Sequence, residues 1–172
     1  HTELDTWLAE MPHGDDVVLT ATMRAIEPAS NQLVYCPQQL VLGVGCARGC
    51  AADELIPHVL ERLKAHDLNP LAIAAVVSVD IKADEPAIKA LAAHLDVPLR
   101  VFDVERLEAE TPRLANPSDV VFDEIGVHGV AEAAALAASG VNGRLLIEKQ
   151  KSASATMAVA LLDEPCTDIA ML

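Results

Sequence analysis

Residues 42–49 read Leu-Gly-Val-Gly-Cys-Ala-Arg-Gly, and this stretch decides the fold. The apolar residues 39–44 predict a strand, and from Ala51 onward apolar residues recur at helical spacing. A strand that leads through a glycine-rich turn into a helix is a common anion site of α/β proteins. The N-terminus of such a helix offers unpaired N–H groups and a partial positive charge.

The glycine spacing disfavours the common nucleotide sites. Gly43, Gly45 and Gly49 form the pattern G-x-G-x-x-x-G. The dinucleotide fingerprint is G-x-G-x-x-G with a later acid for the ribose, and the P-loop needs a lysine that is missing here. A nucleotide-binding domain is therefore a weak hypothesis. Two interpretations of this stretch stay open: a different kind of anion site, or a tight turn that only packs a strand on a helix.

Length and composition limit the number of domains and exclude some kinds of binding partner. A chain of 172 residues predicts one domain, with room for a small N-terminal attachment. The hydrophobic fraction is 52%, but Trp, Tyr and Phe together contribute four residues, so Ala, Val and Leu must fill the core. The net charge of -14 argues against binding to nucleic acid or to an anionic membrane surface.

The cysteines predict neither a metal site nor a disulfide framework. Cys46 and Cys50 are spaced C-x-x-x-C, and no second pair with histidines completes a zinc set. Reduced thiols in the cytoplasm are the expectation. The sequence shows no signal-peptide pattern and no apolar run of about 18 residues.

Strand and helix patterns alternate from residue 39 onward. Strands are expected at 39–45, 73–79, 99–103, 143–148 and 156–162, and helices at 51–66, 84–95, 104–109, 117–125 and 130–139. We expect Asp84 to be the N-cap of its helix, with Pro86 in the first turn. This order predicts an α/β fold with three layers, α/β/α, and a mostly parallel, mixed sheet whose last two strands form a hairpin.

The domain boundaries follow from the same patterns. Residues 1–37 are expected to be an N-terminal attachment or linker with a short helix at 3–11 and strands at 17–22 and 32–36. Residues 38–162 form the main domain, in which 149–155 is a polar linker between the last two strands. Residues 163–172 are expected to be a loose tail.

Three polar clusters follow strands of the expected sheet, and ligands of open α/β sheets bind beyond the carboxyl ends of strands. The clusters consist of Cys46 and Arg48, of Asp80, Lys82, Asp84 and Glu85, and of Lys149, Lys151 and Ser152. They hold four of the 12 basic residues of the chain. This concentration predicts a positive cleft suited to a polycarboxylate or phosphate, although Lys and Arg are also common in ordinary loops.

Single residues allow more than one interpretation. Cys46 lies near a helix N-terminus and Arg48, a setting that lowers the pKa of a thiol. No histidine lies nearby in sequence to serve as its base, so a small turn-lining cysteine is favoured over a nucleophile. Glu85 is a candidate general acid or base, but an acid at a helix start also complements the helix dipole. Glu132 occupies an equivalent first-turn position, and His128 is interpreted as a loop residue.

Four stretches together resemble the C-terminal domain of the CbiG/CobE family of cobalamin biosynthesis. They are Gly43-Val-Gly-Cys-Ala-Arg-Gly49, Asp80-Ile-Lys-Ala-Asp-Glu-Pro86, Gly126-Val-His-Gly-Val-Ala-Glu-Ala-Ala-Ala-Leu136 and Leu146-Ile-Glu-Lys-Gln-Lys-Ser152. They come in the order of the family with similar gaps and cover about residues 38–162. His128-Gly129 departs from the small or hydroxyl residues expected at that place.

The resemblance implies a domain that binds a precorrin or cobalt-precorrin. CbiG-type proteins resemble cobalt-precorrin-5A hydrolases, which open a lactone and release acetaldehyde, whereas CobE-type proteins match only this domain. No cofactor is expected on protein side chains, and any cobalt lies within the tetrapyrrole. The expected substrate-binding residues are Gly43, Gly45, Cys46, Arg48, Gly49, Lys82, Glu132, Lys149, Lys151 and Ser152. Glu85 is the expected proton-transfer residue.

Two functional expectations stay open. Residues 1–37 are too few for the N-terminal domain of the CbiG type, so we expect a CobE-like protein or part of a larger cobalt-precorrin-5A hydrolase. The alternative is a non-catalytic module that carries a corrinoid or contacts other corrin-pathway enzymes. The sequence leaves open whether this chain is an enzyme.

Overall fold

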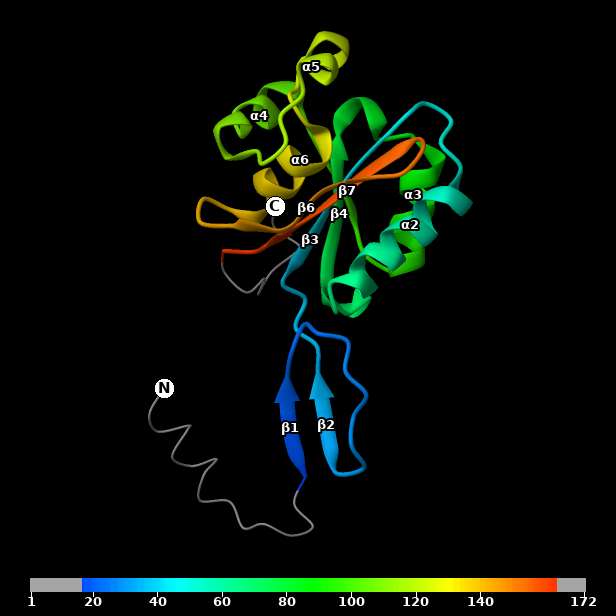
Figure 1. The fold of residues 1–172 in the computed structure, drawn as a ribbon, viewed down its shortest axis with the longest axis vertical. Helices are drawn as coiled ribbons and strands as arrows, with labels where there is room; N and C mark the ends of the chain where they lie inside the picture. Colours follow the sequence, from blue (N-terminus) through cyan, green and yellow to red (C-terminus); the bar gives the residue numbers. More distant parts are fainter. Residues whose placement is uncertain (1–16, 164–172) are drawn as a thin grey trace.

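The computed structural model describes residues 17–163, whose main body is a five-stranded sheet in the order β5-β4-β3-β7-β6 (Figure 1). The strands are β3 (Leu40–Cys46), β4 (Ile73–Val79), β5 (Leu99–Phe102), β6 (Arg144–Lys151) and β7 (Ala155–Leu161). The first three run parallel, and β7 is antiparallel to both of its neighbours. The predicted mixed sheet and its C-terminal hairpin are confirmed.

Helices cover both faces of the sheet (Figure 1). One face carries α2 (Ala52–Ala65) and α3 (Pro86–Leu95), and the other carries α4 (Val104–Glu108) and α6 (Val130–Ser139). The short helix α5 (Asp119–Ile125) leads into α6, and single 3-10 turns occupy η1 (Pro70–Ala72), η2 (Asp80–Lys82) and η3 (Thr111–Arg113). The predicted three-layer α/β/α fold is therefore confirmed.

The central strands and α6 pack unusually closely because their residues are small. All seven residues of β4 are buried, as are the first six of β3, which is typical of strands covered on both faces. Four buried alanines of α6 let that helix approach the sheet. A Cβ added at Gly43 would lie 1.9 Å from the carbonyl oxygen of Ala131, so only glycine fits there.

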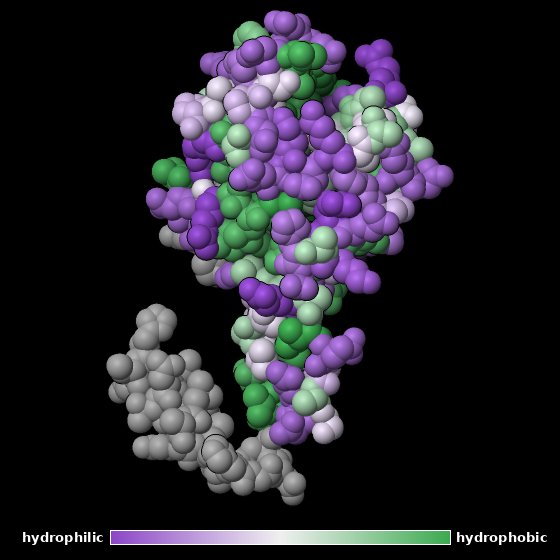
Figure 2. Space-filling view, in the orientation of Figure 1, coloured by the Kyte–Doolittle hydropathy of each residue, from purple (hydrophilic) through white to green (hydrophobic). Residues whose placement is uncertain are grey.

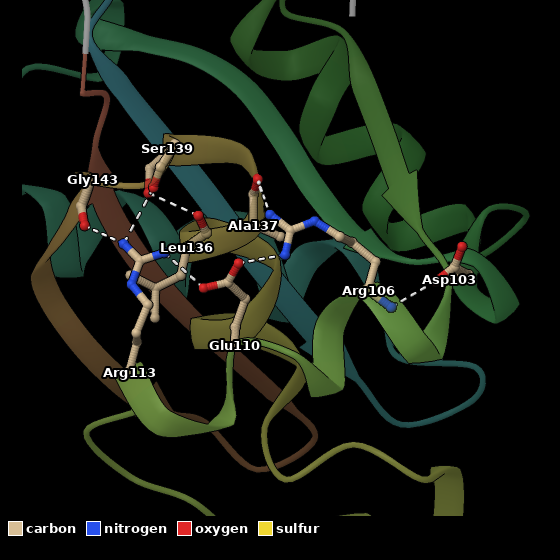
Figure 3. A network of polar contacts seen from close by, with 9 residues as sticks. Asp103, Arg106, Glu110, Arg113, Leu136, Ala137, Ser139 and Gly143 are labelled. Carbon is tan, nitrogen blue, oxygen red and sulfur yellow. Dashed lines mark hydrogen bonds and ion pairs between the residues drawn. The ribbon is translucent and has the colours of Figure 1, made fainter.

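A buried carboxylate anchors the C-terminal end of α6 (Figure 3). Glu110 lies between the guanidinium groups of Arg106 and Arg113 and forms an ion pair with each. The same two arginines donate to the carbonyl oxygens of Ala137 and Gly143, just inside and just beyond the helix. Arg106 thereby satisfies one of the carbonyl groups that the end of α6 leaves unpaired, and Arg113 ties the segment after the helix to the same carboxylate.

Two local predictions were wrong. β6 extends to Lys151, which pairs with Thr156 of β7, so Lys149 and Lys151 belong to a strand rather than to a polar linker. The N-cap of α3 is Glu85, since Pro86 is the first helical residue. Asp84 instead forms a 2.7 Å ion pair with Lys89, which lowers the pKa of its carboxyl group.

The N-terminal strands extend away from the main body (Figure 1). β1 (Val18–Ala21) and β2 (Gln32–Tyr35) form a two-stranded parallel sheet. Leu19 is paired with Leu33, and both are more than 60% exposed. Figure 2 shows apolar residues at the surface of this extension. The predicted helix at 3–11 and all of the predicted tail after Asp163 lie outside the described residues. Between residues 17 and 163, no helix is long and apolar enough to cross a membrane.

Candidate functional site

A cleft of about 440 Å³ opens at the carboxyl ends of β3, β4 and β6. Its lining includes Gly45, Cys46 and Arg48 from the glycine loop, Lys82 from η2, and Lys149, Lys151 and Ser152 from the C-terminal hairpin. All four basic residues of the predicted clusters therefore lie around one cleft. Gly43, Gly49, Glu85 and Glu132 are not among its lining residues. The binding roles assigned to these residues stay predictions.

The glycine loop forms one wall of the cleft. Gly45 faces Thr156 and Val130 so closely that an added Cβ would lie 2.9 Å from the Thr156 hydroxyl oxygen. Gly49 has a φ of +75°, the left-handed region that favours glycine. Arg48 is exposed, and its side chain has no hydrogen-bond or ion-pair partner within residues 17–163. Its guanidinium group is thus available to an anion.

Glu85 supports this loop from outside the cleft. One of its carboxylate oxygens accepts a 2.9 Å hydrogen bond from the Gly49 N–H, and the other lies 3.5 Å from the Lys82 ammonium. The Glu85 side chain is 9% exposed. Its position indicates that it fixes the loop and the Lys82 side chain, while the predicted role in proton transfer finds no support in the lining of the cleft.

The turn between β6 and β7 forms a second wall, and Glu54 of α2 holds it. Glu54 accepts hydrogen bonds from the hydroxyl groups of Ser152 and Ser154, each at 2.6 Å. These bonds, together with one from the Ser154 N–H, lower the pKa of Glu54 to about 2. The Ser154 carbonyl oxygen in turn accepts from Ala47 N–H at 2.7 Å, which ties the turn to the glycine loop.

Glu132 is a buried structural acid rather than a cleft residue. It is 1% exposed and accepts hydrogen bonds from the N–H groups of Ala115, Asn116 and Lys149 at 2.8–3.0 Å, and from the Asn116 amide. Burial alone would raise the pKa of Glu132, but these bonds outweigh it and lower the pKa. Glu132 thus holds the loop before α5 against β6.

The ammonium group of Lys149 is partly buried. Its ammonium donates to the carbonyl oxygen of Asn116. Desolvation lowers the pKa of Lys149, and the positive charge of Lys151 adds to this, while Glu132 acts in the opposite direction. An anion in the cleft would relieve the repulsion between the two lysines.

The third wall is largely apolar and comes from α5 and the start of α6. It consists of Val121, Ile125 and Val130, with Glu124 as the one carboxylate among the lining residues. The sequence predicted a helix here but no role in the site, because its short apolar pattern gave no sign of what it faces. The predicted site also lacked Ser154 and Thr156.

Cys46 is a neutral thiol. Burial raises its pKa to about 11, and the nearby Lys82 only partly offsets this effect. The expectation that its surroundings lower the pKa was wrong, because desolvation of the half-buried thiolate costs more than the neighbouring cation contributes. The interpretation as a small turn-lining cysteine rather than a nucleophile fits this environment.

The cleft combines positive charge, hydroxyl groups and an apolar wall. Four cations against one carboxylate in its lining contrast with the net charge of -14 of the whole chain. This combination suits a ligand that has both an apolar surface and several carboxylates. Among residues 17–163, no three His, Cys, Asp or Glu side chains converge as metal ligands.

Comparisons with known proteins identify the family of this chain. A family model described as cobalamin synthesis G C-terminus matches residues 40–160. The chain is similar to protein CobE of Sinorhizobium sp, with 46% identity over 70% of this chain and 79% of that protein. It is also similar to the cobalt-precorrin-5A hydrolase of Priestia megaterium, with 29% identity over 94% of this chain and 43% of the hydrolase.

A solved structure gives the same result. The crystal structure of CobE, a protein from the cobalamin (vitamin B12) biosynthetic pathway, matches with a TM-score of 0.68 and 37% identity. The match covers 73% of this chain and 92% of that one. The chain therefore belongs to the family of the cobalamin synthesis G C-terminus and is a cobalamin biosynthesis protein of the CobE/CbiG type.

Proposed function

We propose that the cleft binds a precorrin-type tetrapyrrole by its peripheral carboxylates. The observation that carries this proposal is the convergence of Arg48, Lys82, Lys149 and Lys151 around one cleft of a strongly acidic protein. Acetate and propionate groups at the rim of a tetrapyrrole would pair with these cations. The face of the ring would lie against Val121, Ile125 and Val130. Any cobalt would enter as part of this ligand.

The proposal is tested by titrating the full chain with a stable corrin polycarboxylate and recording its visible spectrum. Replacing Arg48→Gln and Lys151→Gln together removes two exposed cations of the cleft. The expected loss of affinity is on the order of tenfold, as for two partly exposed ion pairs. The control Lys64→Gln with Arg144→Gln removes the same charge from exposed positions outside the cleft. Equal affinity of both double variants would contradict the proposal.

Two roles are compatible with such binding. The chain would act as a CobE-like protein, or as the C-terminal part of a cobalt-precorrin-5A hydrolase that opens a lactone and releases acetaldehyde. It spans less than half the length of the hydrolases that it matches. The alternative is a non-catalytic carrier or a module that contacts other corrin-pathway enzymes. The position of Glu85 favours binding without chemistry, because Glu85 is not among the lining residues and its carboxylate is engaged by Gly49 and Lys82.

An acetaldehyde assay with cobalt-precorrin-5A separates these roles. Binding without release of acetaldehyde is expected for a carrier or for a domain that needs the remainder of a hydrolase. Release by this chain alone, with the product growing in proportion to chain concentration, would establish hydrolysis and refute the carrier role.

A further inference from the structure

Helix α5 has little packing of its own to hold it in place. It has seven residues, none of which is buried, and none of its side chains belongs to the two core clusters. Val120 and Phe122 are exposed. A helix of this length is not stable by itself, because too few hydrogen bonds repay its nucleation. Its position must come from contacts with its neighbours.

His128 supplies three of these contacts. Its imidazole ring stacks on the ring of Phe122 with a centroid distance of 4.4 Å and an interplanar angle of 25°. Its carbonyl oxygen accepts a 2.7 Å hydrogen bond from the N–H of Ser118, the residue that caps α5. Its Nε2 lies 3.8 Å from the carboxylate of Asp119. His128 thus touches the start and the middle of α5.

His128 is itself fixed by α4. Nδ1 lies 2.8 Å from one carboxylate oxygen of Glu108, and the backbone N–H of His128 donates to the other at 3.1 Å. The neighbouring Leu107 of the same helix is completely buried. A continuous set of contacts therefore leads from the core through Glu108 and His128 to α5.

We propose that His128 is a positioning residue that fixes α5 as the apolar wall of the cleft. His128 is not among the lining residues, whereas Val121 and Ile125 of α5 are. It acts on the ligand through these two side chains and holds them at the distance at which the face of a tetrapyrrole contacts them. This inference rests on the proposed function for the identity of the ligand, but its structural part is independent of any ligand.

The test combines two measurements on His128→Ala. Amide hydrogen exchange of the free protein reports how firmly α5 is held, and titration with the stable corrin polycarboxylate reports affinity. We expect exchange in residues 119–125 to become about tenfold faster while β3 and β4 keep their protection. Affinity should fall by a comparable factor. His94→Ala, which alters an exposed histidine of α3, should change neither.

Two conservative variants separate the contacts of His128. His128→Phe keeps a ring to stack on Phe122, and His128→Asn keeps a polar group for Glu108. Each is expected to restore part of the protection of α5, which a merely destabilised protein would not show.

Unchanged exchange of α5 in His128→Ala would overturn the inference. Faster exchange with unchanged affinity would overturn its link to the ligand. A wild-type chain that does not bind the corrin would refute the proposed function, while the exchange data would still decide whether His128 positions α5.

Discussion

Glu54 and Ser154 are 100 positions apart in the sequence, yet two hydrogen bonds join them, from the Ser154 hydroxyl at 2.6 Å and from its N–H at 2.8 Å. Ser152 donates a third bond to the same carboxylate. The first turn of α2 therefore determines where the turn between β6 and β7 lies at the edge of the cleft.

Glu54→Gln should weaken ligand binding without unfolding the protein. The amide retains one acceptor oxygen and replaces the other with an NH₂ group, which cannot accept hydrogen bonds from the serines. We expect a loss of affinity for the corrin polycarboxylate of about threefold to tenfold. Glu61→Gln is the matched control, since Glu61 is exposed on the same helix. Equal affinities in a spectroscopic titration would show that Glu54 does not determine the geometry of the cleft.

The same carboxylate makes stability depend on pH. The pKa of Glu54 is lowered from 4.5 to about 2 in the folded chain, chiefly by the hydrogen bonds from Ser152 and Ser154. A lowered pKa means that the stabilisation is complete above the unfolded value of 4.5 and is lost as the pH falls toward 2. Urea denaturation at about pH 5 and about pH 3 should therefore show a smaller decrease for Ser152→Ala with Ser154→Ala than for the wild type. Parallel decreases would contradict this assignment.

Gly43→Ala should destabilise the fold severely. The added methyl group would lie 1.9 Å from the Ala131 carbonyl oxygen, and its three nearest atoms all belong to the backbone of α6, so no flexible side chain could move aside. We expect a loss of about 3 kcal/mol or more in the free energy of unfolding. Gly49→Ala meets no atom within 4 Å and is strained only by its positive φ, so it should cost about 1–2 kcal/mol. Urea denaturation of both variants checks this order, and the reverse order would refute it.

Glu110→Gln should reduce stability but leave the cleft intact. Two arginines would lose their buried anion, which we expect to cost about 2–3 kcal/mol because both guanidinium groups remain partly solvated. Glu105→Gln on the exposed side of α4 serves as control. Affinity for the corrin measured on folded protein should equal that of the wild type. A change in affinity without a change in stability would contradict the anchoring role of Glu110.

The sequence pattern of each segment was enough to predict the central strands and the alanine-rich helix of the fold. The apolar runs of β3 and β4 and the alanines of α6 indicate their elements without help from the rest of the chain. The rule that ligands bind at the carboxyl ends of strands singled out Arg48, Lys82, Lys149 and Lys151. All four line one cleft, and their role in binding stays a prediction.

Hydrogen bonds between residues far apart in the sequence could not be predicted from such patterns. Glu132 resembles any first-turn acid in sequence, and only the loop around Asn116, folded back on it, turns it into a buried structural residue. Glu54 was missed because its serines lie about 100 residues away. Lys149 and Lys151 looked like loop residues because polar side chains hide a strand at the edge of a sheet.

The antiparallel strand β7 has a consequence for synthesis on the ribosome. It lies between β3 and β6, so the sheet has a gap until residues 155–161 are available. A nascent chain that ends before Ala155 exposes the open edge of β3 and leaves β6 without β7, the one strand that pairs with it among residues 17–163. The cleft, which needs the turn between β6 and β7, therefore cannot form before residues 152–161 have been synthesised, and binding competence arises only once that turn and β7 have emerged.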